Sequence, residues 1–441
     1  MTTTLDPEAS VASFPAPRTL EEAGLNFDLV MQLVLKMLHL SGTLTGVELA
    51  ERVGLSFSAI EPVLEFLTAQ HQCEISGGAM VGRPSFNFRI TDAGRTRATL
   101  FLESSHYVGV APVPLAQYRR YMEGFERSLP ATINRDQVRE AFSHLVLSQA
   151  FLDHLGPAIN SRHSMFVYGP PGNGKSVISL AIKKLLAGEI AVPHAIEVEG
   201  NIVRLFDPVN HEPVATATDD TAALEREEPT DRRWVRCHRP LVMVGGELTL
   251  ENLDLQYNET SGFYRMPVQV VANGGVLVID DFGRQKCQPR DLLNRWIVPL
   301  ENRVDFLTLQ SGQKFDVPFV VLVVFATNIK PAELVDDAFL RRIQYKIFAE
   351  SPTVDDFIQI FENYCEERGV GFDRSLVQRL LESYFRPRQI PLRGCQPRDL
   401  INQALYRARY LGEPERLTFD LLEAACASYF VDNVDTPPVF A

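Results

Sequence analysis

The sequence predicts an α/β protein with a parallel sheet, preceded by a helix-rich domain and followed by a small helical domain. From about residue 141 to residue 350, apolar runs typical of buried strands alternate with helical patterns, as in parallel α/β folds. After residue 352 the apolar residues repeat at helical spacing alone. Before the α/β region, three helical patterns and two strand-like runs follow the order of a winged helix-turn-helix domain.

Length and composition limit the classes of protein to consider. With 441 residues the chain is long enough for several domains, each with its own core. Its formal charge of −13 argues against a protein that coats nucleic acid through its overall field, which leaves only a local basic patch for such contacts. The six cysteines form no C-x-x-C pair, so we expect reduced thiols rather than a zinc site or a disulfide framework.

The sequence carries no pattern of a secretory signal or a membrane span. The first residues lack the basic and apolar regions of a signal peptide. The longest apolar runs, such as 317–326, are too short to cross a bilayer. We therefore expect a cytoplasmic protein that has no membrane partner.

Changes in composition mark the domain boundaries. A start rich in Thr, Ala and Pro predicts a flexible leader, and a long interruption of the α/β alternation predicts an insertion. The strongly charged stretch 219–233 within this insertion is typical of a solvated loop. The predicted segments are a leader (1–24), a winged-helix domain (25–103), a linker (104–140), an α/β domain (141–350, with an insertion at about 188–262), a helical lid domain (351–430) and a loose tail (431–441).

The predicted winged-helix domain rests on apolar spacing and on helix-capping patterns. Thr45 and Glu48 have the spacing of a capping box, in which each side chain bonds the backbone of the other. Ser58, with Glu61 three residues later, has the same spacing and predicts the start of the third helix. The helical patterns begin at Phe27, Thr45 and Ser58, and the strand-like runs cover 73–76 and 86–90.

The third helix of this domain is poorly suited to reading DNA. Between residues 57 and 70 it carries Glu61 and Glu65 but neither Lys nor Arg, and contacts to phosphate and guanine need cations. Arg83 and Arg89 lie in the predicted wing, so contact between the wing and a DNA backbone stays open. This distribution favours a protein-docking or hinge role over specific DNA reading.

A glycine-rich loop lies between a strand-like run (165–168) and a helical pattern (177–182). This is the context that a phosphate-binding loop requires, because the loop backbone and the start of the helix point N–H groups at phosphate oxygens. Lys175 is expected to reach the β- and γ-phosphates, and Ser176 to hold Mg²⁺. An amphipathic helix over 138–151 is expected to precede this strand. The predicted nucleotide-binding residues are Gly169, Pro170, Pro171, Gly172, Asn173, Gly174, Lys175, Ser176 and Val177.

Polar side chains follow two further strand-like runs. Asp280 and Asp281 end the run 276–279, and Asn328 follows the run 320–326. A carboxylate at a strand end beside a phosphate loop is suited to hold Mg²⁺, so Asp280 is the predicted metal residue. Asp281 is then placed to orient or deprotonate the attacking water, and Asn328 to position the water and the γ-phosphate.

Three arginines complete the predicted site. Arg341 and Arg342 follow the second of these strands and could neutralise transition-state charge on the same nucleotide or on that of a neighbouring subunit. Arg398 lies at the start of a helix in the small domain, where it could reach the phosphates when that domain closes.

The ordered set of motifs resembles the AAA+ ATPases over about residues 140–430. The resemblance implies hydrolysis of ATP with Mg²⁺ in a homo-oligomeric ring, commonly a hexamer. Asp281 matches the catalytic acid of that family, Asn328 its first sensor residue, Arg341 and Arg342 its arginine finger, and Arg398 its second sensor. The run from 300 to 328 also looks like the MoxR-type branch, which implies chaperone-like remodelling of a protein client.

Two departures from the family pattern leave alternatives open. The catalytic acid of the family is usually Glu, whereas this chain has Asp281, so hydrolysis could be slow. The winged-helix domain lies outside the common AAA+ core and keeps a DNA partner open. The sequence therefore predicts an ATPase that remodels a protein, with a DNA-associated regulator as one alternative and a nucleotide sensor with little turnover as another.

Overall fold

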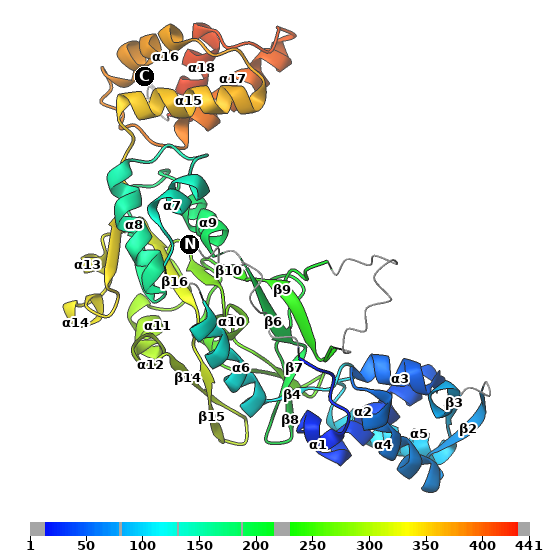
Figure 1. Ribbon diagram of the computed structural model, residues 1–441. Helices are drawn as coiled ribbons and strands as arrows, with labels where there is room; N and C mark the ends of the chain where they lie inside the picture. The colour runs from blue at the N-terminus through cyan, green and yellow to red at the C-terminus, as the bar shows by residue number, and fades with distance from the viewer. Residues whose placement is uncertain (1–13, 79–81, 130–131, 187, 216–229, 431–441) are drawn as a thin grey trace, which may run out of the picture. The chain divides into compact units, whose positions relative to one another are not determined.

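The computed structural model describes residues 14–78, 82–129, 132–186, 188–215 and 230–430 (Figure 1). The predicted tail, residues 1–13 of the leader and residues 216–229 of the charged stretch lie outside this part of the chain. The chain divides into two compact units: unit 1 comprises Met1–Ala131, Leu186–Val278 and Gln285–Leu322, and unit 2 comprises Thr132–Leu185, Ile279–Arg284 and Val323–Ala441. The described residues contain no helix that is long and apolar enough to cross a membrane.

The α/β class predicted from the sequence is confirmed. A five-stranded sheet has the order β10-β13-β16-β5-β17. Strand β5 (Ser164–Tyr168) pairs in parallel with β16 (Leu322–Thr327) on one side and with β17 (Tyr345–Phe348) on the other. Residues 322–327 are all buried, as expected for a central strand with both faces covered. The glycine-rich loop therefore leaves the sheet from a strand that lies between two others.

The first part of unit 1 contains the helices and strands on which the winged-helix prediction rests. The capping box of Thr45 and Glu48 is confirmed, because each side chain bonds the backbone of the other. The third helix begins at Phe57, one residue before the predicted start near Ser58, and Ser56 caps it by accepting a bond from the Ala59 N–H. The elements are α2 (Phe27–Ser41), β1 (Thr43–Thr45), α3 (Gly46–Val53), α4 (Phe57–Ala69), β2 (Cys73–Gly78), η1 (Arg83–Ser85), β3 (Phe86–Ile90) and α5 (Asp92–Ser104).

The rest of unit 1 is built mainly from short strands. One five-stranded sheet has the order β11-β12-β8-β7-β4, and two further pairs are β6-β9 and β14-β15. The remaining elements are α1 (Leu20–Ala23), β4 (Val113–Pro114), α6 (Leu115–Ser128), β6 (Glu189–Pro193), β7 (Ala195–Val198), β8 (Asn201–Arg204), β9 (Trp234–His238), β10 (Leu241–Val244), η2 (Leu250–Leu253), β11 (Gln256–Asn258), β12 (Phe263–Arg265), α10 (Val268–Val271), β13 (Val276–Ile279), α11 (Pro289–Arg295), α12 (Ile297–Asn302), β14 (Val304–Thr308) and β15 (Lys314–Pro318).

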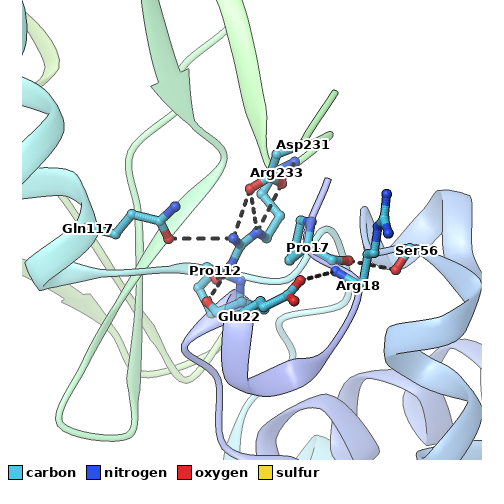
Figure 2. A network of polar contacts seen from close by, with 9 residues as sticks. Pro17, Arg18, Glu22, Ser56, Pro112, Gln117, Asp231 and Arg233 are labelled. Carbon is cyan, nitrogen blue, oxygen red and sulfur yellow. Dashed lines mark hydrogen bonds and ion pairs between the residues drawn. The ribbon is translucent and has the colours of Figure 1, made fainter. Parts of the chain in front are cut away.

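A buried ion pair in unit 1 corrects the prediction of a solvated loop over 219–233 at its last residues, because residues 219–229 lie outside the described part of the chain. The side chains of Asp231 and Arg233 are both 1% exposed, and they pair at 2.8 Å. The Arg233 guanidinium also donates to the carbonyl oxygens of Ala23 (2.9 Å) and Pro112 (3.4 Å), and Figure 2 shows this network. Burial of these charges is tolerated because each charge is paired and hydrogen-bonded. The charge pattern of the sequence does not show which residues will be paired in this way.

The segment before α2 belongs to the same network. The Phe14 ring stacks on Trp234 with centroids 4.7 Å apart, and the Asp231 N–H donates to the Phe14 carbonyl oxygen. The hydroxyl of Ser56 donates to the carbonyl oxygen of Pro17 at 2.6 Å (Figure 2). Residues 14–24, which lie in the predicted leader, thus make specific contacts with both the insertion and the start of α4.

Unit 2 begins with two helices where the sequence predicts one. The prediction of a single amphipathic helix over 138–151 is wrong. Helix α7 (Arg135–Ala141) ends before an irregular segment, and α8 (Gln149–Ser161) begins after it. Ser148 caps α8 by accepting from the Phe151 N–H. The apolar residues of segment 142–148 therefore serve a loop, and apolar spacing alone cannot distinguish that from a helix.

The remaining part of unit 2 consists of the helix after the phosphate loop and a C-terminal helical group. The C-terminal helices share one apolar core, which includes Phe357, Phe361, Leu400 and Leu422. In Figure 1 these helices, coloured orange to red, lie together. The elements are α9 (Lys175–Leu185), α13 (Pro331–Leu334), α14 (Asp337–Leu340), α15 (Val354–Arg368), α16 (Arg374–Leu380), a π-helical turn (Leu381–Phe385), α17 (Gln396–Leu411) and α18 (Phe419–Tyr429).

Candidate nucleotide-binding site

The glycine-rich loop joins β5 to α9 with a backbone that only glycine adopts readily. Gly169, Gly172 and Gly174 have φ angles of 149°, 81° and 75°. A side chain at Gly169 would lie 2.5 Å from the carbonyl oxygen of Ala349, whereas nothing lies within 4 Å of one at Gly174. The loop is therefore packed against protein where it starts and open where α9 begins, so that the N–H groups there can meet an anion.

Lys175 and Ser176 begin α9 and bond different partners. The ammonium of Lys175 donates to the carbonyl oxygens of Gly169 at 3.1 Å and Pro170 at 2.9 Å, so the side chain curls over the loop. The hydroxyl of Ser176 donates to a carboxylate oxygen of Asp280 at 2.7 Å. This hydrogen bond joins the phosphate loop to the end of β13 (Val276–Ile279). Its two partners are the side chains that we predicted from the sequence as metal ligands.

The charge environment of Lys175 is set by opposing effects. Burial lowers the pKa of Lys175, the carboxylates of Asp280 and Asp281 act against that lowering, and the guanidinium of Arg393 adds to it. The anions of a polyphosphate would favour the charged ammonium in the same way as the two carboxylates do. Arg393 was not among the predicted site residues, because no motif in the sequence marks it.

Asp281 and Asn328 lie at neighbouring strand ends. The Asn328 side-chain amide donates to a carboxylate oxygen of Asp281 at 3.1 Å. Two bonds hold these ends together: the Phe282 N–H donates to the Ala326 carbonyl oxygen, and the Thr327 hydroxyl donates to the Phe282 carbonyl oxygen, both at 2.7 Å. Asp281 has φ of 48°, in the left-handed region, which aims it away from the extended path of the strand.

The loop and the two strand ends line one cavity of about 520 Å³. This volume lies within the range of about 300–1,000 Å³ that is usual for small-molecule sites. Segment 144–147 lines it as well, and three of those four residues are the apolar Leu145, Val146 and Leu147. The other lining residues are Pro171 to Ile178, Asp280, Asp281, Asn328, Ile360, Asn363, Tyr364, Glu367, Gly394, Cys395 and Arg398.

The sequence prediction missed two groups of residues that line the cavity. These are segment 144–147 and the residues of α15. The sequence prediction placed this segment inside one amphipathic helix, whereas its apolar residues form a wall of the cavity between α7 and α8. Burial lowers the pKa of His144, with a contribution from Lys184. Ser148 is a good N-cap residue, and this is the sequence signal that could have revealed the start of α8 and the loop before it.

The start of α17 is bonded directly to the phosphate loop. The Cys395 N–H donates to the Gly172 carbonyl oxygen at 2.8 Å, and the side-chain amide of Asn173 donates to the Ala349 carbonyl oxygen at 3.3 Å. A side chain at Gly172 would lie 2.6 Å from the Cys395 sulfur, so glycine is required there for space as well as for its φ. The residue that precedes α17 thus helps to fix the loop.

The structure places the three predicted arginines differently. Arg398 lines the cavity, but its Nε lies 3.0 Å from a carboxylate oxygen of Asp399. Arg341 and Arg342 do not line the cavity; Arg341 is exposed, and the Arg342 guanidinium carbon lies 5.9 Å from the centre of the Phe339 ring. An action of this pair on a nucleotide bound in the same cavity is therefore not supported by its position.

The residues present fit a magnesium nucleotide. Magnesium in such sites binds one or two carboxylates together with phosphate and water oxygens, and Asp280 and Ser176 offer this donor set beside the loop. Among the described residues no three His, Cys, Asp or Glu side chains are grouped to hold a metal by themselves. The Ser176 hydroxyl and the Asp280 carboxylate are thus the kind of donors that bind Mg²⁺ together with phosphate oxygens.

Comparison with known proteins adds limited information. A family model described as a domain of unknown function (DUF8689) matches residues 353–428, which hold α15 to α18 except for the last residue, Tyr429. No curated protein matches the chain.

Solved structures resemble the chain weakly. The RuvB Holliday junction branch migration motor of Thermotoga maritima is 12% identical, with a TM-score of 0.35, and the match covers 70% of this chain and 74% of that one. NtrX from Brucella abortus is 14% identical, with a TM-score of 0.38, over 71% of this chain and 59% of that one. The fold described above rests on the strand order and on the phosphate loop of the chain itself.

Proposed function

We propose that this chain is an ATPase of the AAA+ type that uses Mg-ATP to remodel or switch a protein partner. The observation that carries the proposal is the meeting of three motif elements in one cavity. Ser176 is bonded to Asp280, and Asp281 is bonded to Asn328, beside Lys175 on the phosphate loop. These are the residue types that position and activate water against a nucleotide, and phosphoryl transfer depends mainly on such positioning.

Each residue has a role that its chemistry supports. Lys175 would hold the β- and γ-phosphates, while Ser176 and Asp280 would hold Mg²⁺, which supplies charge neutralisation when bound. Asp281 would orient or deprotonate the attacking water, and the Asn328 amide would hold that carboxylate and the water in line. Arg398 would contact the phosphates once it leaves Asp399.

The proposal includes a homo-oligomeric ring, taken as a hexamer. Its support is the position of Arg341 and Arg342 outside the cavity of their own chain, combined with the resemblance to AAA+ proteins. In a ring these arginines would complete the site of the neighbouring subunit. The resemblance to the MoxR-type branch further supports a chaperone-like action on a protein.

A protein partner is proposed over duplex DNA. The two wing arginines that could contact a DNA backbone each lie beside carboxylates: Arg83 pairs with Glu61 and Glu65, and Arg89 pairs with Glu74. These ion pairs join three carboxylates to two arginines. This balance of charge disfavours the counterion release that drives binding to DNA. No observation on the described residues favours the DNA-associated alternative.

The first test is the ATPase rate of site variants. Asp281→Asn is expected to lower kcat by about 10²- to 10⁴-fold, the usual value of a positioned acid or base, while ATP binding is kept. Lys175→Ala is expected to lose ATP binding because the phosphates lose their cation. Phosphate release and binding of a fluorescent ATP analogue measure the two effects separately.

Matched substitutions at exposed positions outside the cavity serve as controls. Asp291→Asn and Lys330→Ala change the same residue types and should leave both measurements unaltered. If the unaltered chain turned over no faster than Asp281→Asn, the motor function would be wrong, and binding of ATP without hydrolysis would instead indicate a nucleotide sensor.

A further inference from the structure

A groove lies between helix α4 and the strands β2 and β3, far along the sequence from the nucleotide-binding residues. Its volume is about 410 Å³, which is enough for apolar anchors of a bound segment. The apolar lining consists of Phe57, Leu64, Ala69, Ile75, Phe86 and Phe88. Ile75 is 49% exposed, so an apolar wall of this α4 groove faces solvent. An exposed apolar surface bordered by polar residues is typical of an interaction site.

The border of the α4 groove is acidic. Glu61 and Glu65 line it from α4, and a single cation, Arg83, lies between them, at 3.0 Å from Glu61 and in contact with Glu65. The side chains of Glu65 and Arg83 are 59% and 60% exposed. Ion pairs this exposed contribute little free energy, so a basic group of a ligand could join or replace Arg83 at modest cost.

The start of α4 is not available to a nucleic-acid phosphate. The hydroxyl of Ser56 donates to the carbonyl oxygen of Pro17 at 2.6 Å, and that of Ser58 donates to the carbonyl oxygen of Arg18 at 3.0 Å. Figure 2 shows Pro17 and Arg18 beside Ser56. The N-terminal segment therefore occupies the helix end at which a phosphate would otherwise meet backbone N–H groups. The groove remains as the accessible feature of this face of α4.

Segments of this chain outside the described residues do not complement the groove. Residues 1–13 and 431–441 contain Asp or Glu but neither Lys nor Arg, and residues 216–229 carry five acidic residues, Asp219, Asp220, Glu225, Glu227 and Glu228, against one arginine. An acidic segment would bring like charges to Glu61 and Glu65. Charge complementarity thus selects a basic ligand from another protein.

We propose that the α4 groove binds a segment of a protein partner in which apolar side chains are flanked by Lys or Arg. The apolar side chains would enter between Leu64, Ile75 and Phe86, and the flanking cations would pair with Glu61 and Glu65. This inference rests on the proposed function, since it gives the chemistry and the docking place of the protein that the ATPase would remodel. Recognition of a short segment through a few apolar anchors is a common mode of peptide binding.

The test is a selection of peptides on the full chain. A random library of short linear peptides is selected on the immobilised protein and counter-selected on the double variant Glu61→Lys with Glu65→Lys. The expected result is a consensus of apolar residues flanked by Lys or Arg. A synthesised consensus peptide should bind the unaltered chain, and its affinity should fall by at least about tenfold for the double variant and for Ile75→Asp.

Control variants match each change outside the groove. Glu21→Lys with Glu103→Lys makes the same change of charge, and Leu100→Asp places the same carboxylate at another exposed apolar residue, so both should bind the peptide as the unaltered chain does. Circular dichroism of every variant verifies that the fold is kept. A selection without consensus, an acidic consensus, or binding that the groove variants leave unchanged would overturn the proposal.

Two other occupants give distinct results. If duplex DNA competed with the peptide, the groove would be assigned to nucleic acid. If a groove variant lowered the mass measured by sedimentation, the groove would be assigned to a second copy of the chain. Either result would overturn the proposal. Basal ATPase activity is measured in parallel, and the groove variants should keep it. If the unaltered chain showed no ATPase activity, the proposed function would be wrong. If only the peptide selection failed, the groove assignment alone would be wrong.

Discussion

At the scale of single residues, Arg398 is held by a short chain of contacts. Its Nε lies 3.0 Å from one carboxylate oxygen of Asp399, whose other oxygen accepts from the Tyr429 hydroxyl at 3.3 Å. That hydroxyl is 3.5 Å from the sulfur of Cys395, which bonds the phosphate loop through its backbone. Asp399 is thus fixed in place and, under the proposed function, would compete with a bound phosphate for the Arg398 guanidinium. The Arg398 side chain is 58% exposed and that of Asp399 27%, so solvent screens the pair and its contribution is small.

Asp399→Asn should therefore release Arg398 toward the nucleotide. The neutral amide keeps an acceptor for the Tyr429 hydroxyl but loses the charge that holds the guanidinium, so we expect the KM for ATP to fall by about two- to fivefold with a smaller change in kcat. Steady-state phosphate release measures both. In an Arg398→Ala background the same substitution should have no effect. An equal fall in KM in that background would show that Asp399 acts by another route.

At the scale of elements, helix α2 carries a buried lysine that the function does not use. Lys36 is 2% exposed, and its ammonium donates to the carbonyl oxygens of Ser105 at 2.8 Å and Tyr107 at 3.2 Å. Burial lowers the pKa of Lys36 to about 8. The bonds tie α2 to the residues that follow α5, while the buried charge costs free energy at neutral pH.

This lysine predicts a dependence of stability on pH. Its pKa is lower in the folded than in the unfolded chain, so the destabilisation is complete below about pH 8 and disappears as the pH approaches the unfolded value of about 10.4. Stability of the unaltered chain relative to Lys36→Met should thus rise over this interval, by at most about 3 kcal/mol. Thermal unfolding of both proteins from pH 7 to pH 10 measures the difference. A constant difference would show that the ammonium is solvated.

At the scale of the whole molecule, the decisive question is whether one active site is shared between two copies of the chain. The cavity of one chain holds Lys175, Asp280, Asp281 and Asn328 but neither Arg341 nor Arg342. Within the described residues, a site with bound phosphate would therefore have one arginine, Arg398, lining it directly. A ring would supply the second positive group from a neighbour.

Mixing of inactive variants tests this arrangement. Lys175→Ala and the double variant Arg341→Ala with Arg342→Ala should each lose ATPase activity. When the two are mixed in equal amounts and allowed to exchange subunits, about a quarter of the interfaces should pair an intact loop with intact arginines, so activity should return to about that fraction. Co-purification through a tag on one variant verifies mixing. Mixed rings without activity would contradict action between subunits.

Much of the fold and of the candidate site could be predicted from the sequence because the signals are local. The strand, loop and helix around Gly169 to Ser176 are contiguous, and the strand before Asp280 and the strand before Asn328 are apolar runs that only a buried sheet accommodates. The helical character of the chain after residue 352 followed from apolar residues that repeat at helical spacing. The roles assigned to the site residues stay predictions.

Tertiary structure alone decided which distant groups meet. Apolar spacing could not show that the segment after α7 lines a cavity, and charge patterns could not show that Arg233 is buried or that Arg83 bridges two carboxylates of α4. The physical reason is that the signal of a phosphate loop lies in contiguous residues, whose glycines permit the backbone angles of the loop. Burial of a charge and the opening of a cavity depend instead on partners that are far away in the chain and come together only when it folds.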